Sequence, residues 1–220
     1  MKVLIIGSDT QLAEFKEKFT APHEYEYSTG EQINGALPEY DVIFDCYLGD
    51  NPEQFEMYAG LEGTAVFVNA PKISLAELAY YQGYVDCTLF GFNGLPSFIN
   101  RSLLEVSCLN EADEPKLKAI CEQLGTEFEL VADRVGMVTP RIICMIINEA
   151  FYTLQEGTAS REDIDMGMKL GTNYPFGPFE WSERIGLNHV YELLEAMYED
   201  TKEERYKICP LLKQHYLRLK

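Results

Sequence analysis

The stretch that most constrains the fold is residues 171–188, which read GTNYPFGPFEWSERIGLN. It holds three glycines, two prolines and four aromatic residues. Proline lacks a backbone donor and biases the residue before it toward an extended conformation, so a helix does not continue through residues 174–179. We therefore expect a rigid aromatic corner between two helices. A packed interhelical turn without chemistry of its own is one interpretation of this corner, and a functional loop is the other.

The first half of the chain alternates strand and helix patterns. Residues 2–7 (KVLIIG) form an apolar run that ends at a glycine, as in a strand buried on both faces of a parallel sheet. Residues 11–19 follow with helical spacing, so the chain opens where nucleotide-binding folds place their phosphate loop. Further strands are expected at 24–28, 41–48, 63–69, 87–92, 102–108 and 126–132, and helices at 51–61, 73–81 and 116–124. This alternation predicts a doubly wound parallel sheet.

The second half of the chain has a purely helical pattern. No strand periodicity follows residue 133, so we expect an α/β domain over residues 1–133 and an all-α domain over residues 134–220. The first helix of the second domain begins near Pro140 and is apolar on most of its circumference, which is typical of the centre of a bundle or of a subunit interface. Ser160 and Asp163 resemble a capping box before the next helix.

Composition excludes several classes of function. The net charge of −18 argues against nucleic acid or an anionic membrane as partner, because phosphate binding requires a basic face. The N-terminal apolar run is too short for a secretory signal, and no segment approaches the roughly 20 apolar residues of a membrane span. We therefore expect a cytoplasmic protein. The six cysteines have no metal-ligand spacing, which predicts buried thiols and no metal site.

Several short motifs in the helical half form one pattern. They include Asn148-Glu149-Ala150, Asp163-Ile164-Asp165, Tyr174-Pro175, Gly177-Pro178-Phe179 and Ile185-Gly186-Leu187. This pattern resembles the C-terminal signature of the 3-hydroxyacyl-CoA dehydrogenase family. The resemblance implies a reduced Rossmann-like domain followed by a helical domain that forms a homodimer and closes one side of the substrate cleft. It also implies NAD as cofactor and the oxidation of a 3-hydroxyacyl-CoA as the reaction.

The N-terminal half resembles the same family but departs from it at the cofactor loop. The family's G-x-G-x-x-G corresponds here to the run from Gly7 to Leu12, GSDTQL. The resemblance assigns Gly7, Ser8 and Thr10 to cofactor binding. Asp9, however, adds a carboxylate where the pyrophosphate would lie, and Leu12 replaces the glycine that allows close packing of the helix.

The family's catalytic positions also carry different residues. The resemblance aligns the substrate-binding serine with Pro71, the general-base histidine with Phe90 and the substrate-orienting asparagine with Pro140. The glutamate that partners the histidine aligns with Glu105, which is our candidate catalytic residue. Phenylalanine cannot accept a proton and a proline side chain cannot donate a hydrogen bond, so the family's histidine–glutamate route is closed to this chain.

Other titratable residues offer few replacements. The only histidines are His23, His189 and His215, and a structural or exposed position accounts for each of them. Asp45 is the more unusual carboxylate, because it lies in an apolar strand where a charge must be paired or must lie at the strand's end. Capping of the strand end is the simpler interpretation of Asp45.

These departures favour a degenerate, non-catalytic member of the family, a pseudoenzyme that binds a ligand or partners an active relative. An oxidoreductase with an altered substrate or altered catalytic residues is the first alternative, and a structural or partner-binding dimer is the second. The connection at residues 29–40 is also too short for the helical hairpin with which the family holds its CoA ester. An acyl-CoA-like or other small-molecule ligand is therefore left undecided.

Overall fold

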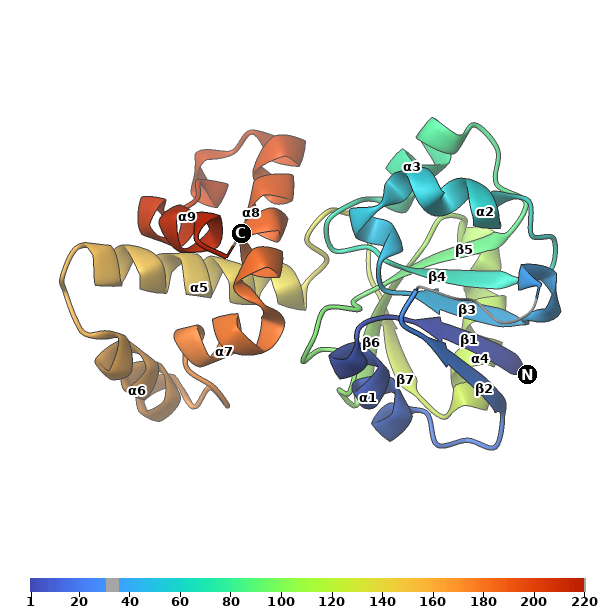
Figure 1. Cartoon of the computed structure of the whole chain (residues 1–220), viewed down its shortest axis with the longest axis horizontal. Coiled ribbons are helices and arrows are strands. Elements are labelled where there is room, and N and C mark those ends of the chain that lie inside the picture. Colours follow the sequence, from blue (N-terminus) through green and yellow to red (C-terminus); the bar gives the residue numbers. More distant parts are fainter. Residues whose placement is uncertain (31–35, 220) are drawn as a thin grey trace. The chain divides into compact units, whose positions relative to one another are not determined.

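The computed structural model describes residues 1–30 and 36–219 (Figure 1). Residues 31–35 fall within the short connection noted above, so that part of the connection lies outside the described residues. The chain divides into two compact units, Met1–Met137 and Val138–Lys220. The sequence placed this boundary slightly earlier, near Asp133.

The first unit is built on a seven-stranded sheet with the order β2-β1-β3-β4-β5-β6-β7. The strands are β1 (Lys2–Ile6), β2 (Glu24–Ser28), β3 (Val42–Asp45), β4 (Ala65–Asn69), β5 (Thr88–Phe92), β6 (Leu103–Cys108) and β7 (Glu127–Leu130). Ile6 at the end of β1 pairs with Ser28 on one side and with Asp45 on the other. The chain therefore winds in opposite directions from β1, which confirms the doubly wound sheet. Open α/β sheets bind ligands at such a switch point, at the carboxyl ends of the strands.

One strand departs from the predicted all-parallel sheet. β6 runs antiparallel to β5, with Phe90 opposite Cys108, and parallel to β7. Residues 93–102, all of them described, contain turns but no helix between these strands. Without a crossover helix the chain can only return in the opposite direction, so the sheet is mixed.

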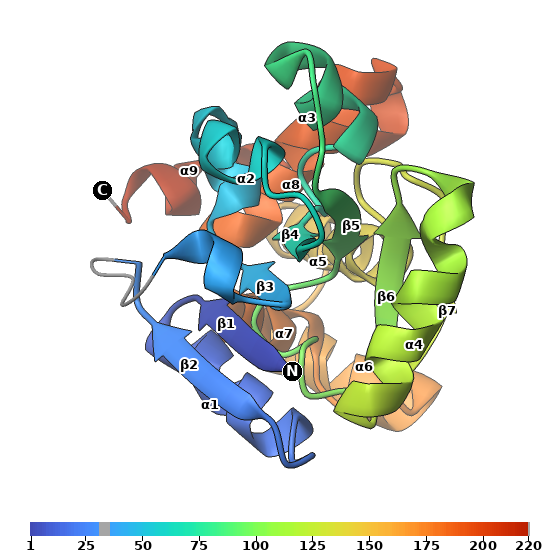
Figure 2. The ribbon, with the colours of Figure 1, turned by 90° about the vertical axis from the view of Figure 1, so that its right-hand side faces the viewer.

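Helices cover both faces of the sheet (Figures 1 and 2). On one face, α1 (Asp9–Lys18) and α4 (Glu114–Leu124) pack over a core that includes Phe15, Phe44 and Phe67. On the other face, α2 (Glu56–Ala59) and α3 (Leu75–Gln82) cover a core that includes Tyr58 and Leu78. Short 3-10 turns complete the unit: η1 (Leu37–Glu39), η2 (Leu48–Asp50), η3 (Pro52–Phe55) and η4 (Glu111–Asp113).

The second unit contains helices and turns and no strand among its described residues. Its elements are α5 (Thr139–Gln155), α6 (Arg161–Thr172), α7 (Pro178–Ile185), α8 (Leu187–Thr201), η5 (Glu204–Tyr206) and α9 (Pro210–Leu217). α5 packs against α7, α8 and α9, as expected from the first of its two interpretations, the centre of a bundle. The buried Asn148 side chain of α5 donates to the Lys207 carbonyl (2.9 Å) and accepts from the Cys209 N–H (2.9 Å), and so ties the approach to α9 onto α5.

The six cysteines are free thiols, five of them buried, as the sequence predicted. Burial raises the pKa of Cys87 to about 11 and that of Cys121 to about 12, so both are poor nucleophiles at neutral pH. Among the helices of the described residues, none combines the length and the apolar character needed to cross a membrane.

Candidate functional site

The candidate cofactor site is the turn between β1 and α1. Gly7 fits there tightly, because a Cβ atom on this residue would lie 3.2 Å from Cys46 Sγ. Ser8 is the N-cap of α1: its Oγ accepts from the Gln11 N–H (3.4 Å), and Gln11 Oε1 accepts from the Ser8 N–H (2.9 Å). In this capping box the N–H groups of Ser8 and Gln11 are satisfied by each other's side chains. Asp9 and Thr10 are exposed beside it.

Gln11 extends this network to the ends of three further strands. Its Nε2 donates to the carbonyl of Gly94 (2.7 Å), in the loop after β5, and only 4% of Gln11 is exposed. The Gly94 N–H in turn donates to Asn69 Oδ1 (2.9 Å), and Asn69 Nδ2 donates to the Cys46 carbonyl (3.1 Å). Two buried amide side chains therefore hold the carboxyl ends of β3, β4 and β5 to the start of α1.

Sequence reasoning missed the roles of Gln11 and Asn69. For Gln11 a signal existed, because Ser8 followed three residues later by glutamine is the sequence pattern of a capping box. For Asn69 no local signal existed, because its partner Gly94 lies 25 residues away in the chain.

Asp45 ends β3 as a buried cap, which confirms the simpler interpretation of this carboxylate. Its Oδ1 accepts from the N–H groups of Tyr47 (2.8 Å) and Leu48 (3.0 Å), and its Oδ2 accepts from the Tyr58 hydroxyl (2.7 Å). Burial raises the pKa of the Asp45 carboxyl, while these three hydrogen bonds act in the opposite direction. The same burial, together with the nearby carboxylate, raises the pKa of Tyr58 far above its ordinary value.

A small pocket opens beside Asp45, at the switch point between β1 and β3. Its volume is about 280 Å³, just below the roughly 300–1,000 Å³ of typical small-molecule pockets. It is lined by Ile6, Thr29, Gly30, Asp45, Tyr47, Asn51, Gln54 and Met57. Among the described residues its lining mixes apolar and polar side chains and includes no lysine or arginine, so these residues offer no cationic side chain to a phosphate.

The candidate pair at the family's catalytic positions is not brought together. Phe90 is fully buried in the core beneath α1 and α4, with its ring centroid 4.9 Å from that of Phe67. Glu105 lies on β6 between Leu104 and Val106, whose side chains enter that same core. Because side chains alternate along a strand, Glu105 projects to the opposite face of the sheet. Glu105 is 8% exposed.

The remaining candidate positions have structural surroundings. Pro71 is buried, and its carbonyl accepts from the Gly136 N–H (2.6 Å). Pro140 lies in the first turn of α5 and is also buried. His23 precedes β2, at the N-terminal edge of the sheet, and its Nε2 lies 2.9 Å from the Gln123 carbonyl oxygen. The His215 ring packs edge-on against a phenylalanine of α5.

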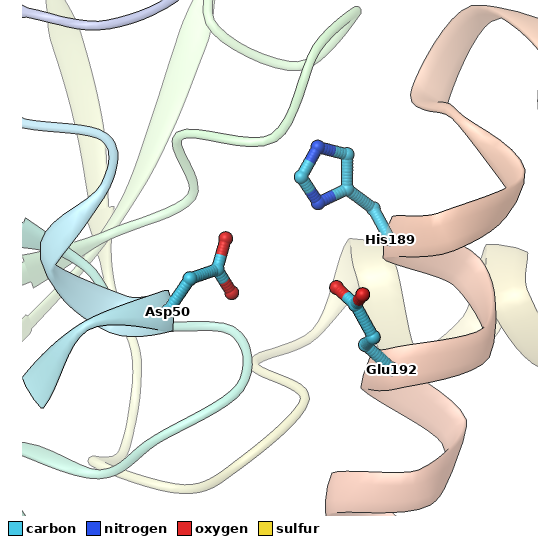
Figure 3. A group of neighbouring side chains, drawn as sticks. All are labelled: Asp50, His189 and Glu192. Carbon is cyan, nitrogen blue, oxygen red and sulfur yellow. The ribbon is translucent and has the colours of Figure 1, made fainter. Parts of the chain in front are cut away.

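Figure 3 shows three polar side chains, Asp50, His189 and Glu192. Asp50, in η2, belongs to the first unit and pairs there with Lys72 (2.7 Å). His189 and Glu192 belong to the second unit, where they project from the same side of α8 about one turn apart (Figure 3). Both are half-buried, and Glu192 accepts a hydrogen bond from the Tyr216 hydroxyl (3.4 Å).

The aromatic corner joins α6 to α7 through residues 173–177. Asn173 ends α6 in a left-handed conformation, and Pro178 is the first residue of α7. The Asp165 carboxylate of α6 accepts from the N–H groups of Phe179 (2.8 Å) and Glu180 (3.2 Å), and so caps α7 from outside. The expected corner between two helices is confirmed, but the prediction that residues 174–179 are all non-helical is wrong at its end, because Pro178 and Phe179 are the first two residues of α7.

Known proteins with similar sequences are 3-hydroxyacyl-CoA dehydrogenases and their relatives. The sequence model described as "3-hydroxyacyl-CoA dehydrogenase, C-terminal domain" matches residues 136–218. Over 107 residues the chain is 44% identical to the 3-hydroxyadipyl-CoA dehydrogenase of Escherichia coli, which covers 48% of this chain and 22% of that protein. Over 183 residues it is 39% identical to the 3-hydroxybutyryl-CoA dehydrogenase of Clostridioides difficile, which covers 80% of this chain and 65% of that protein. The chain thus spans less than two thirds of either relative.

A solved structure shares the whole fold. The (S)-3-hydroxybutyryl-CoA dehydrogenase of Ralstonia eutropha superimposes with a TM-score of 0.75, over 99% of this chain and 93% of that one, at 22% sequence identity. At this identity the likeness establishes the architecture only: an α/β unit of Rossmann type followed by a helical unit.

Proposed function

The chain belongs to the 3-hydroxyacyl-CoA dehydrogenase family, and we propose that it is a member that has lost the family's NAD-dependent oxidation. The observation that carries this proposal is the closed turn between β1 and α1. An anion at a helix N-terminus needs free backbone N–H groups, but the Ser8 N–H is held by Gln11. Asp9 adds an exposed carboxylate to the same turn. The residues present therefore do not fit the pyrophosphate of NAD.

The surroundings of the catalytic positions support the same proposal. A general base must lie within hydrogen-bond reach of the proton that it removes. Phe90 is buried and has no proton acceptor, and Glu105 projects to the other face of the sheet. The sequence of the first unit holds one histidine, His23. It directly precedes β2 and so lies at the amino ends of the parallel strands, whereas the closed turn follows the carboxyl end of β1.

Calorimetric titration with NAD tests the loss of cofactor binding. We expect no binding heat and no rise in melting temperature at millimolar NAD, whereas an active dehydrogenase of the family, run alongside, shows both. Replacing Asp9 and Gln11 together by glycine frees the helix N-terminus and should restore weak NAD binding. Lys16→Gly, also on α1, controls for the lower helix propensity of glycine. Binding by the unaltered chain with the affinity of the active enzyme would contradict the proposal.

An activity assay separates the proposal from an oxidoreductase with altered residues. We expect no reduction of NAD with 3-hydroxybutyryl-CoA. If turnover is observed and Glu105→Gln abolishes it, the chain is an enzyme that uses a different constellation of residues, and the proposed loss of catalysis is wrong.

We also propose that the helical unit forms a homodimer. The supporting observation is α6: none of its residues, all of which the structure describes, is buried, and Met166 and Leu170 are 54% and 81% exposed. An apolar helix face of this kind needs a partner. Sedimentation should give a dimer that Leu170→Glu dissociates, while Leu217→Glu, at an exposed leucine of α9, leaves it intact. A monomeric chain at all concentrations would refute the homodimer.

A further inference from the structure

A surface at the end of α3 exposes three tyrosines within five residues. Tyr80, Tyr81 and Tyr84 are 81%, 75% and 53% exposed, and the rings of Tyr80 and Tyr81 meet at 5.6 Å between centroids. Single exposed apolar side chains are ordinary, but neighbouring aromatic rings on a surface mark an interaction site. We call these three residues the tyrosine surface.

The helix that carries the tyrosine surface is firmly held. The Asp133 carboxylate accepts from the N–H groups of Leu75 (2.8 Å) and Ala76 (2.9 Å), which fixes the start of α3. Leu75 and Leu78 are buried beneath the helix, and Gly83, in a left-handed conformation, ends it. The tyrosines are therefore presented on a rigid support, which lowers the entropy lost when a partner binds.

A pocket adjoins the tyrosine surface between α3 and the η3–α2 segment. Its volume is about 420 Å³, and it is lined by Pro52, Glu53, Glu56, Leu78, Tyr81 and Gln82. Tyr81 thus belongs to both the surface and the pocket, and the exposed Glu53 and Glu56 line the same pocket. η3, which leads into α2, packs against α3, and Figure 2 shows α2 and α3 on this side of the sheet.

The charge around the pocket selects the kind of partner. Residues 48–86 contain six acidic residues and one basic residue, Lys72, whose ammonium group is paired with Asp50 (2.7 Å). An anionic ligand would be repelled here, whereas a cation gains from the carboxylates and from the faces of the tyrosine rings. Arginine combines both interactions, because its planar guanidinium stacks on aromatic rings and binds carboxylates through two parallel hydrogen bonds.

We propose that the tyrosine surface and the adjoining pocket dock an arginine-bearing segment of a partner protein. One guanidinium enters the pocket between Tyr81 and the carboxylates of Glu53 and Glu56, and the neighbouring residues of the segment lie over Tyr80 and Tyr84. None of these residues takes part in the closed turn at α1, so the docking does not depend on whether the chain has lost NAD binding.

Fluorescence anisotropy with a labelled peptide of alternating arginine and glycine tests this docking. The matched control is the same peptide with citrulline in place of arginine, which keeps the shape and removes the charge. We expect the arginine peptide to bind at low salt and the citrulline peptide to bind at least about tenfold more weakly. Equal binding of the two peptides would overturn the assignment of a cationic segment.

Substitutions in the chain locate the binding site. The triple variant Tyr80→Ser, Tyr81→Ser, Tyr84→Ser and the double variant Glu53→Gln, Glu56→Gln should each weaken binding at least about tenfold, because each removes one half of the cation site. Glu111→Gln with Glu114→Gln, exposed acids of η4 and α4, removes the same charge elsewhere and should leave the affinity within about twofold.

Equal losses in the two glutamate variants would mean attraction by net charge alone and would overturn the proposal. So would a triple tyrosine variant that binds as the unaltered chain does. Sedimentation tests whether the tyrosine surface instead contacts a second copy of this chain. If the unaltered chain is a dimer and the triple tyrosine variant is a monomer, the proposed partner is wrong. Circular dichroism checks that each variant is folded.

Discussion

The N-termini of α1 and α7 are closed by different chemistry. In both helices the third residue reaches back to the N–H of the N-cap residue, Gln11 to Ser8 (2.9 Å) and Glu180 to Gly177 (3.1 Å). At α7, however, a second acceptor, the Asp165 carboxylate, comes from another helix. The cap of α7 is therefore a charged tertiary contact, whereas that of α1 is a neutral local one that continues to the loop after β5.

The two helix caps therefore have different expected roles, one in stability and one in ligand access. Removing the Asp165 cap of α7 breaks one of the contacts between α6 and α7 and should weaken the helical unit. Removing the cap of α1 should leave the central strands β3 and β4, which are buried on both faces, in place and change mainly what can reach the helix N-terminus. We therefore expect stability to depend on the aromatic corner and ligand access to depend on the turn after β1.

The largest effect is expected from Gly177→Ala. A Cβ atom at this position would lie 2.2 Å from Asp165 Cγ, so either the corner or the cap must move. The loss of packing and of two capping hydrogen bonds should destabilise the helical unit by about 3 kcal/mol. The single tryptophan, Trp181 of α7, is buried and reports unfolding of this unit in urea.

The matched control for this substitution is Gly171→Ala in α6. No heavy atom lies within 4 Å of a Cβ placed there, and alanine is the better helix former, so the variant should be neutral or slightly stabilised. If both substitutions destabilise the chain equally, the contact with Asp165 does not explain the effect of Gly177→Ala.

Asp165→Ala should have the second largest effect, a loss of about 2 kcal/mol in the free energy of unfolding, because the N–H groups of Phe179 and Glu180 lose their acceptor. Asp165→Asn keeps one acceptor oxygen and should lose less. Urea titrations followed through Trp181 fluorescence measure both. If alanine and asparagine cost the same, the carboxylate does not act through these two hydrogen bonds, and the contrast with α1 fails.

The corner and the closed turn also differ in how far sequence reasoning could reach. The corner follows from local rules, because proline and glycine fix backbone conformation wherever they stand. The hydrophobic pattern likewise predicted the alternation of strands and helices along the first unit. The antiparallel β6 was not, because its direction depends on a missing crossover helix and not on its own residues.

The candidate site also depends on contacts that sequence reasoning could not reach. Matching motifs identified Phe90 and Glu105 as corresponding positions, but only the sheet register shows that their side chains occupy opposite faces. The link from Gln11 through Gly94 to Asn69 joins three segments that are far apart in the chain. Contacts of this kind depend on tertiary packing, which no local pattern encodes.

Gln11→Ala should have a smaller effect than the corner variants, about 1 kcal/mol, because it removes neutral hydrogen bonds at one helix end. Hydrogen exchange of the first-turn amides of α1 should quicken, while the amides of the central strands β1 and β3 should keep their protection. Gln11→Glu keeps the acceptor for Ser8 but loses the donor to Gly94, so it separates the two halves of the network. If protection falls equally in the strands, the cap of α1 is as structural as that of α7.

The smallest effect belongs to Asp45, a carboxylate that caps a turn as Asp165 does but is buried. Burial raises its pKa, so the folded chain holds this proton more tightly than the unfolded chain, and the stability that the proton provides is lost as the pH rises through the folded pKa. Asp45→Asn does not titrate and keeps one acceptor oxygen, so it should lie within about 1 kcal/mol of the unaltered chain. Its relative stability should improve as the pH is raised from about 4 to about 8. Thermal unfolding over this range measures the trend, and Asp86→Asn, at an exposed acid, should show a flatter one. A relative stability of Asp45→Asn that falls with rising pH would mean that the three hydrogen bonds to Asp45 outweigh its burial, and this carboxylate would then resemble the cap of α7 more closely than burial suggests.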